Sequence, residues 1–217
     1  WDKDLDGDVE RTKTRPIPSK KLSIFESWAV FGTLGLFSLL LLSLTNTNTI
    51  FISLCFGLMI VLYPLTKRFF IGPQIFLGLT FNPTIIVYAM TNELNNPTMI
   101  FLYLAVAAKT IAFDSFYGLC DIEDDKKLGI HSTPLWWGSK TLLIIAILQF
   151  AVISFLMVVG FKAELSSAWY IGIILLSGFY LYQHRLASQK NFLLAFKNNH
   201  WASLYLLILS IFCFLII

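Results

Sequence analysis

Residues 141–161, TLLIIAILQFAVISFLMVVGF, contain no charged side chain and are long enough for one helix to cross the hydrocarbon core of a bilayer. Six further apolar stretches lie on either side of this segment, the shortest of them marginal for a span. They run approximately over Trp28–Leu44, Thr49–Thr66, Pro73–Met90, Thr98–Phe113, Ala168–Tyr182 and Trp201–Ile217. None shows the strict alternation of apolar and polar residues that is typical of a membrane barrel strand. We therefore predict an all-α, polytopic membrane bundle with about seven transmembrane helices.

The composition of the chain also indicates an integral membrane protein. Of its 217 residues, 57% are apolar and only 13% are charged, and the mean hydropathy is +0.72, which is far from the average of soluble domains. We expect a single transmembrane domain over residues 1–217, surrounded by lipid and without a nucleic-acid partner. The sequence opens without methionine and directly in a charged motif, so we expect the natural N-terminus to lie further upstream.

Two acidic clusters interrupt this apolar chain. The first is DKDLD at residues 2–6 and the second is DIEDD at residues 121–125, and each has carboxylates four positions apart. On a helical turn this spacing puts both carboxylates on one face, where like charges repel unless a cation lies between them. Few carboxylate ligands, with room left for substrate phosphates, are typical of Mg²⁺ sites in proteins. The clusters therefore predict a magnesium-dependent enzyme that acts on a diphosphate.

If the seven spans alternate in direction, both clusters lie at one face of the membrane. Residues 1–25, 66–72, 118–140 and 184–200 would share that face, together with fourteen of the sixteen Lys and Arg residues. The distribution of basic residues predicts that this face is cytoplasmic, or faces the matrix in a mitochondrial inner membrane. A simpler interpretation is that basic loops are common at any cytoplasmic face, but it leaves the two matched acidic clusters unexplained.

Several motifs, in order along almost the whole chain, resemble those of the UbiA family of intramembrane prenyltransferases. WDKDLD at residues 1–6, followed by RTKTRP at 11–16, is similar to the end of the family's first aspartate-rich motif. FDSFYG at 113–118, DIEDD at 121–125 and GIHST at 129–133 resemble the second motif, in the form of the 4-hydroxybenzoate polyprenyltransferase branch. Shorter matches are YPLTKR at 63–68, LGLTFN at 77–82 and AFKNN at 195–199.

The resemblance implies a nine-helix bundle in which about seven helices are present, with two preceding Trp1. It implies a first aspartate-rich loop over residues 1–25 and a second over residues 114–139. The expected activity is transfer of a polyprenyl group from polyprenyl diphosphate to the ring of 4-hydroxybenzoate, in ubiquinone biosynthesis, with Mg²⁺ as cofactor. The expected location is a bacterial or mitochondrial inner membrane. Protein partners are not predicted.

The resemblance implies the metal ligands, and side-chain chemistry suggests roles for other residues. Metal ligands are expected at Asp2, Asp6, Asp121 and Asp125. Diphosphate contacts are expected from Arg15 and Lys67, and more weakly from Arg11 and Arg68. The alternative for Lys67 and Arg68 is that they anchor a helix end at the headgroups. Catalytic roles are expected for Tyr63, Tyr117 and Asp114. The two tyrosine faces would stabilise an allylic cation, and the Asp114 carboxylate would position the phenol or accept its ring proton.

Lys109 is an unusual residue for the middle of an apolar span. Lys109 precedes Asp114 by about one helical turn, so we predict that the two side chains form an ion pair. A changed acceptor pocket is the alternative.

Other functions stay open at this point. The acceptor could instead be haem, a naphthoate, a homogentisate or a phosphoribose. The chain could be a transporter or cation channel with carboxylates along an ion path, although both clusters lie in loops at one face. It could also be an inactive, degenerate copy.

Overall fold

The structure is a computed structural model that describes Gly7 and residues 12–216. In this part of the chain all regular secondary structure is helical. The helices are α2 (Ile24–Ser43), α3 (Thr47–Thr66), α4 (Pro73–Thr80), α5 (Thr84–Met90), α6 (Thr98–Cys120), α7 (Ile122–Leu128), α8 (Thr133–Trp137), α9 (Thr141–Lys162), α10 (Ser167–Ser188) and α11 (Phe192–Ile216), with a short 3-10 turn, η1 (Gly138–Lys140), before α9. The all-α prediction is confirmed.

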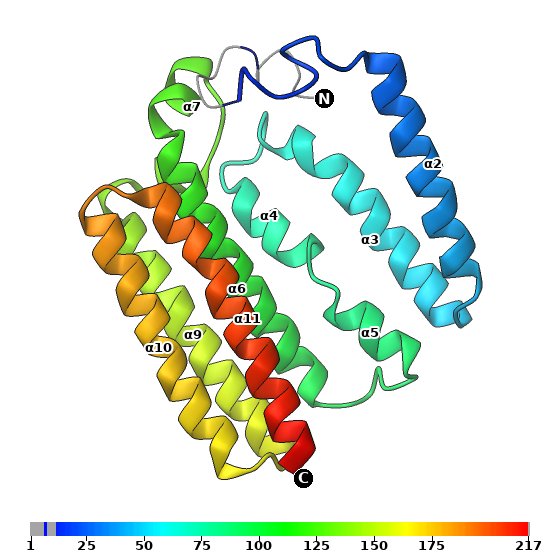
Figure 1. Ribbon diagram of the computed structural model, residues 1–217, viewed down its shortest axis with the longest axis vertical. Coiled ribbons are helices and arrows are strands. Elements are labelled where there is room, and N and C mark those ends of the chain that lie inside the picture. Colours follow the sequence, from blue (N-terminus) through cyan, green and yellow to red (C-terminus); the bar gives the residue numbers. More distant parts are fainter. Residues whose placement is uncertain (1–6, 8–11, 217) are drawn as a thin grey trace.

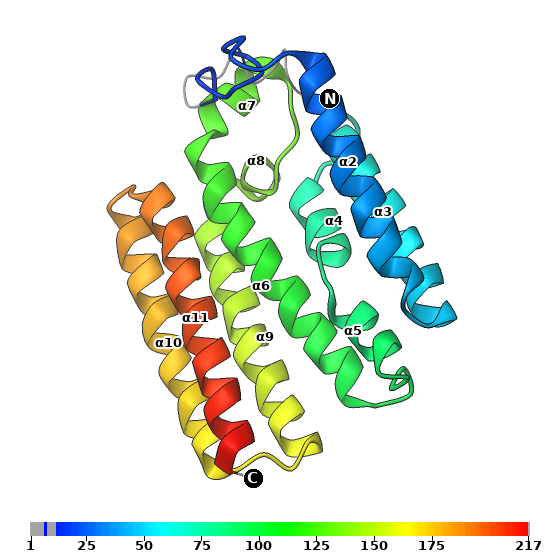
Figure 2. The ribbon, with the colours of Figure 1, turned by 45° about the vertical axis from the view of Figure 1, so that its right-hand side comes forward.

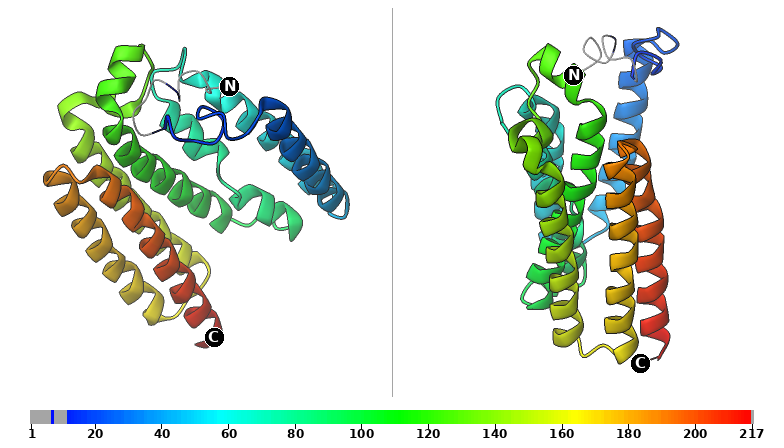
Figure 3. Two further views of the ribbon diagram at one scale, coloured as in Figure 1. Left: turned by 45° about the horizontal axis from the view of Figure 1, so that its top comes forward. Right: turned by 90° about the vertical axis from the view of Figure 1, so that its left-hand side faces the viewer.

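Each of the seven expected spans is helical, six as one helix and one as two shorter helices. Successive spans run in opposite directions (Figure 1). Within the described residues, five helices are long and apolar enough to cross a membrane: Ile24–Ser43, Thr47–Thr66, Thr98–Cys120, Thr133–Lys162 and Phe192–Leu215. Helix α10 is of similar length but carries Gln183, His184 and Arg185 near its end. The chain is therefore an integral membrane protein, with α7 at one end of the bundle and the last turn of α11 at the other (Figure 3).

The third expected span, Pro73–Met90, is not one helix. It is divided into α4 and α5 by a break at residues 81–83. Pro83 supplies no backbone N–H and disfavours helical geometry at Asn82. The Asn82 side chain stabilises the break, because its oxygen accepts a hydrogen bond from Thr84 N at 3.2 Å and its amide donates to Tyr103 O at 2.9 Å. The prediction of a single helix there was wrong for this reason.

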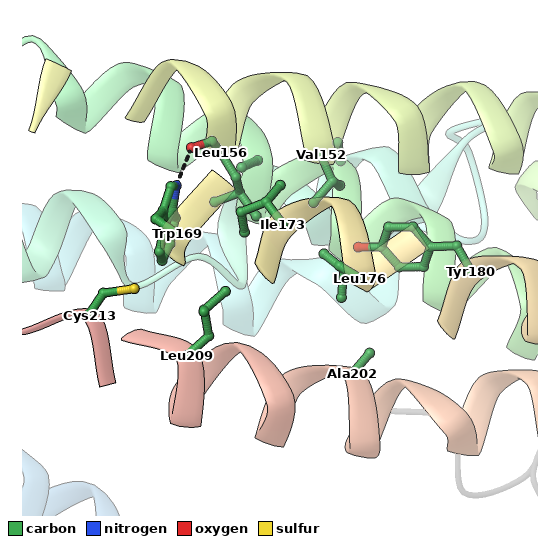
Figure 4. Packing of buried hydrophobic residues seen from close by; sticks show 11 residues of the cluster. Val152, Leu156, Trp169, Ile173, Leu176, Tyr180, Ala202, Leu209 and Cys213 are labelled. Carbon is green, nitrogen blue, oxygen red and sulfur yellow. Dashed lines mark hydrogen bonds between the residues drawn. The ribbon is translucent and has the colours of Figure 1, made fainter. Parts of the chain in front are cut away.

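The main hydrophobic core lies where α6, α9, α10 and α11 pack together (Figure 4). Trp169 of α10 is buried in it and donates a hydrogen bond from Nε1 to Leu156 O of α9 at 2.9 Å. The indole ring lies so close to Gly160 that a Cβ at this position would collide with it. Glycine at position 160 thus permits the close approach of α9 and α10. In contrast, α2 has no buried residue, as suits a helix that faces lipid.

A network of four buried or half-buried polar side chains also joins α9, α10 and α11. His184 Nε2 lies 2.9 Å from Gln149 Oε1, Gln149 Nε2 donates to Gln183 Oε1 at 2.7 Å, and Gln183 Nε2 donates to Asn198 Oδ1 at 3.1 Å. Because Gln149 Oε1 is an acceptor, His184 must carry its hydrogen on Nε2. This network satisfies amides that would otherwise be unpaired in an apolar interior.

Replacement of Gln183 by leucine is expected to destabilise the protein by about 1–3 kcal/mol, because it leaves the buried Gln149 amide and Asn198 carbonyl without partners. Thermal unfolding of the purified protein in detergent measures the effect as a lower Tm. Gln189→Leu is the matched control, since residue 189 is exposed just beyond α10. Equal Tm values for the two variants would contradict the structural role of this hydrogen-bonded network.

Candidate active site

The second acidic cluster lies at the end of the bundle that also holds residues 12–23 and the α3–α4 connection (Figures 1 and 2). One backbone hydrogen bond joins the segment after α7 to the α3–α4 connection, because His131 N donates to Lys67 O at 3.0 Å. Lys67 follows the last residue of α3, and His131 follows α7. The lysine is therefore held beside the acidic segment, although the two are far apart in sequence.

Asp121 and Asp125 are separated by one helical turn. Asp121 occupies the N-cap position of α7 without a capping hydrogen bond from its side chain, and Asp125 N donates a hydrogen bond to Asp121 O at 2.8 Å. The helix ends at Gly129, whose left-handed conformation (φ 66°) suits glycine. Ile130 N then returns a hydrogen bond to Asp125 O at 2.9 Å. The turn that the sequence spacing predicts is present, with both aspartates half-buried.

The surroundings of Asp125 disfavour a negative charge on its carboxyl group. The pKa of Asp125 is raised to about 6. Burial is the main cause, and the negative charges of Asp121 and Asp124 add to it, whereas Ser132 and the ammonium of Lys67 act in the opposite direction. Ser132 lies near the carboxyl group without full hydrogen-bond geometry to it. Clustered, partly buried carboxylates of this kind are hard oxygen donors that fit a divalent cation.

A buried set of hydrogen bonds supports the segment after α7. Thr133 N donates to Gln74 Oε1 at 2.8 Å, and the hydroxyl groups of Thr133 and Ser115 lie 2.8 Å apart. Gly118 of α6 lies against Pro134, where a Cβ would be crowded. These contacts fix α8 between α4 and α6. Neither Gln74 nor Ser115 was among the sequence-predicted residues, because contacts between distant positions leave no local pattern.

The region expected as a second aspartate-rich loop, residues 114–139, consists of the last turns of α6, then α7 and α8 with short connections. Asp114 lies on α6 and is half-buried. Both Lys67 and Asp121 are near enough to act on it electrostatically. The structure thus brings Asp114, Asp121, Asp125 and Lys67 together at one end of the bundle.

The expected ion pair between Lys109 and Asp114 is not formed. Lys109 Nζ instead donates to Ser203 Oγ of α11 at 2.8 Å. Positions five residues apart in an α-helix point in clearly different directions, so the assumed spacing of about one turn was wrong.

The two expected catalytic tyrosines contact different helices. The Tyr117 ring lies 4.7 Å from the Phe196 ring of α11, and the Tyr63 ring stacks on Phe76 of α4 at 6.5 Å with an interplanar angle of 9°. Both tyrosines are half-buried. Phe196 was not predicted as a site residue, although it lies within the AFKNN motif.

The other predicted residues are placed only in part. Arg15, in the segment 12–23, and Arg68, in the α3–α4 connection, are exposed, whereas Asp2, Asp6 and Arg11 lie outside the described residues. In the part of the chain that the structure describes, no three or more His, Cys, Asp or Glu residues are grouped as metal ligands. The joint role of the two acidic clusters therefore stays a prediction.

Comparison with known proteins agrees with the motifs. The model of the UbiA prenyltransferase family matches residues 1–204. A 4-hydroxybenzoate octaprenyltransferase from Alcanivorax borkumensis is 39% identical over 93% of this chain and 71% of its own length. One from Marinobacter nauticus is 37% identical over 93% of this chain and 70% of its own length. The chain thus spans about 70% of the length of these relatives.

Two solved structures share the fold. The apo structure of a UbiA homologue from Aeropyrum pernix K1 superposes with a TM-score of 0.85 at 21% identity, covering 97% of this chain and 80% of that one. A structure of digeranylgeranylglyceryl phosphate synthase gives a TM-score of 0.64 at 18% identity, over 96% of this chain and 74% of that one. The match of the family model and the identity to curated relatives agree with this shared fold, and the chain belongs to the UbiA prenyltransferase family.

Proposed function

We propose that the protein transfers a polyprenyl group from polyprenyl diphosphate to the ring of 4-hydroxybenzoate, as in ubiquinone biosynthesis. The observation that carries this proposal is the meeting of Lys67 with Asp114, Asp121 and Asp125 at one end of a membrane bundle. A long apolar chain with an anionic head group suits such a position, because the bundle contacts lipid and its end offers both cations and metal-binding carboxylates. The names of the relatives at 37–39% identity support the choice of acceptor.

Binding of the diphosphate is assigned to Lys67 and Arg15, with weaker contributions from Arg11 and Arg68. Asp121 and Asp125, together with Asp2 and Asp6, would hold Mg²⁺, which when bound supplies positive charge that stabilises the leaving diphosphate. Lys67 donates to the same oxygens as a point charge. This arrangement stabilises the departing diphosphate more than the bound substrate, since the negative charge on the diphosphate oxygens increases as the bond breaks.

The chemistry breaks one bond and forms another. The carbon–oxygen bond of the prenyl diphosphate breaks, and its electron pair leaves with the diphosphate. The resulting allylic cation is stabilised by the faces of Tyr117 and Tyr63, while the apolar walls exclude water. The ring carbon ortho to the acceptor's hydroxyl forms the new carbon–carbon bond, and the proton on that carbon passes to the Asp114 carboxylate.

Replacement of Asp114 by asparagine is expected to lower kcat by about 10²- to 10⁴-fold, because the amide has the same shape but no longer accepts the proton. The KM for polyprenyl diphosphate should change little. Steady-state turnover in membranes measures both. Glu123→Gln, an exposed position on α7, is the control for loss of a carboxylate at this end of the bundle. Unchanged turnover of Asp114→Asn would remove Asp114 from the mechanism.

The direct test uses membranes that contain the protein in its natural length. These are incubated with 4-hydroxybenzoate, a long polyprenyl diphosphate, and either Mg²⁺ or EDTA, and the products are identified by mass spectrometry. A prenylated 4-hydroxybenzoate that forms only with Mg²⁺ is the expected result. Prenylation of a different aromatic compound would refute the acceptor, and no product with any acceptor would refute the enzymatic function.

We further propose that the end carrying α7 faces the cytoplasm, or the matrix of a mitochondrion. Fourteen of the sixteen Lys and Arg residues fall in the segments that the sequence assigns to this end, which is the distribution typical of cytoplasmic loops.

A further inference from the structure

A pocket of about 570 Å³ opens between α6 and α11. Its walls combine aromatic rings with basic side chains, a mixture that suits a small aromatic anion. The rings are Phe113, Phe196 and Trp201, and the basic groups are Lys109, Lys197 and His200.

Lys109 is the deepest of these basic groups. It lies midway along α6, about 16 Å by helical rise from either end of the helix. Its ammonium group donates to Ser203 Oγ at 2.8 Å and lies 5.5 Å from the centroid of the Phe113 ring. Among the described residues no carboxylate pairs with it. Lysine has three donors, and ionisable groups at such depth usually face a cavity and meet an opposite charge. The pocket therefore offers an ammonium group with unused hydrogen-bonding capacity.

The pocket lies next to Tyr117 of the proposed reaction centre, because Phe196 lines the pocket and also contacts the Tyr117 ring. Lys109, Phe113 and Tyr117 follow one another at four-residue spacing along α6, which keeps them near one face of the helix. Phe196 of α11 lies 5.9 Å from the Phe113 ring and 4.7 Å from the Tyr117 ring. A row of aromatic rings thus connects the Lys109 ammonium with Tyr117.

We propose that Lys109 binds the carboxylate of the aromatic acceptor and selects for acids over neutral phenols. The acceptor ring would lie along Phe113 and Phe196, with its hydroxyl end toward Tyr117. This inference rests on the proposed prenyl transfer to a hydroxybenzoic acid. The depth of Lys109 argues against a phospholipid head group as the occupant, because head groups remain at the ends of membrane helices.

The test measures binding of 4-hydroxybenzoate and of its neutral analogue 4-hydroxybenzamide to the purified full-length protein, without any diphosphate. Loss of one charge-assisted hydrogen bond corresponds to a roughly ten- to hundredfold weaker affinity. Lys109→Met should therefore weaken binding of the acid by this factor and leave binding of the amide nearly unchanged. Lys109→Arg should keep most of the preference for the acid. Because a folding defect would weaken both ligands alike, the ratio of the two affinities reports on the charge alone.

Lys162→Met is the matched control. Lys162 also lies over a phenylalanine ring, 5.9 Å from the Phe101 centroid, but it is the last residue of α9 and does not line the pocket. The ratio of the affinities of the Lys162→Met variant for the acid and the amide should equal that of the wild type. The inference is overturned if the wild type does not prefer the acid, or if Lys109→Met keeps that preference. Selective binding of the acid by a wild-type protein that never prenylates it would retain the inference about Lys109 and refute the proposed function instead.

Discussion

Replacement of Asp121 by alanine is expected to reduce prenyl transfer on the order of 10³-fold or more, because the bound cation contributes several kcal/mol and each 1.4 kcal/mol is tenfold in rate. The same loss is expected for Asp125→Ala. The two aspartates lie one helical turn apart, and a backbone hydrogen bond from Asp125 N to Asp121 O at 2.8 Å closes this turn. Product formation at increasing Mg²⁺ concentration measures the effect, and we expect only partial recovery at high Mg²⁺.

Glu123→Gln is the matched control for these variants. Glu123 belongs to the same short helix and loses the same charge, but it is exposed and lies two positions from either aspartate, hence on another face. We expect its activity to stay within a few-fold of the wild type. Thermal unfolding should show that all three variants are folded. If Asp121→Ala retained as much activity as Glu123→Gln, the assignment of the metal to α7 would be wrong.

Replacement of Lys67 by methionine is expected to lower kcat by about 10²- to 10³-fold, as for removal of a preorganised donor to a developing anion. Methionine preserves the apolar stem and leaves the backbone carbonyl of residue 67 free to accept from His131 N. The effect should fall mainly on kcat rather than on KM for the diphosphate, because charge on the leaving group grows as its bond breaks. Steady-state kinetics with polyprenyl diphosphate as the varied substrate separates the two constants.

Lys140→Met provides the comparison for Lys67→Met. Lys140 is an exposed lysine in η1, in the segment before α9, so it shares any general attraction between a basic surface and an anionic substrate. A decrease of kcat in Lys67→Met alone supports a direct contact. Equal decreases in both variants would mean that Lys67 acts only through the general charge of this surface, as an anchor at the headgroups would.

Most of the architecture follows from the sequence, because a membrane helix satisfies its own backbone hydrogen bonds and is therefore recognisable as a long run of apolar residues. The expected spans were therefore found in the described part of the chain. The break between α4 and α5 was missed although its cause, Pro83, is visible in the sequence. The apolar run over residues 73–90 predicted one helix, but Pro83 within it cannot donate a backbone hydrogen bond.

The site was predictable only where its chemistry is carried by local spacing. Asp121 and Asp125 form the expected helical turn because i, i+4 geometry is fixed by the helix itself. Contacts such as Thr133 with Gln74, 59 positions apart, depend on how α4, α6 and α8 pack, and no pattern along the chain encodes them. The hydrogen-bond partner of Lys109 was predicted wrongly for a related reason, since the observed partner, Ser203, is 94 positions away.

The bond from His131 N to Lys67 O has a consequence for tolerance to substitution. The two halves of the proposed site are joined through main-chain atoms, so the identity of the side chain at position 131 is not what holds them together. Any residue with a backbone N–H can make the same connection, and only proline lacks one. A substitution at position 131 can therefore change charge or size beside the proposed diphosphate site without breaking the backbone bond that holds Lys67 next to the acidic turn.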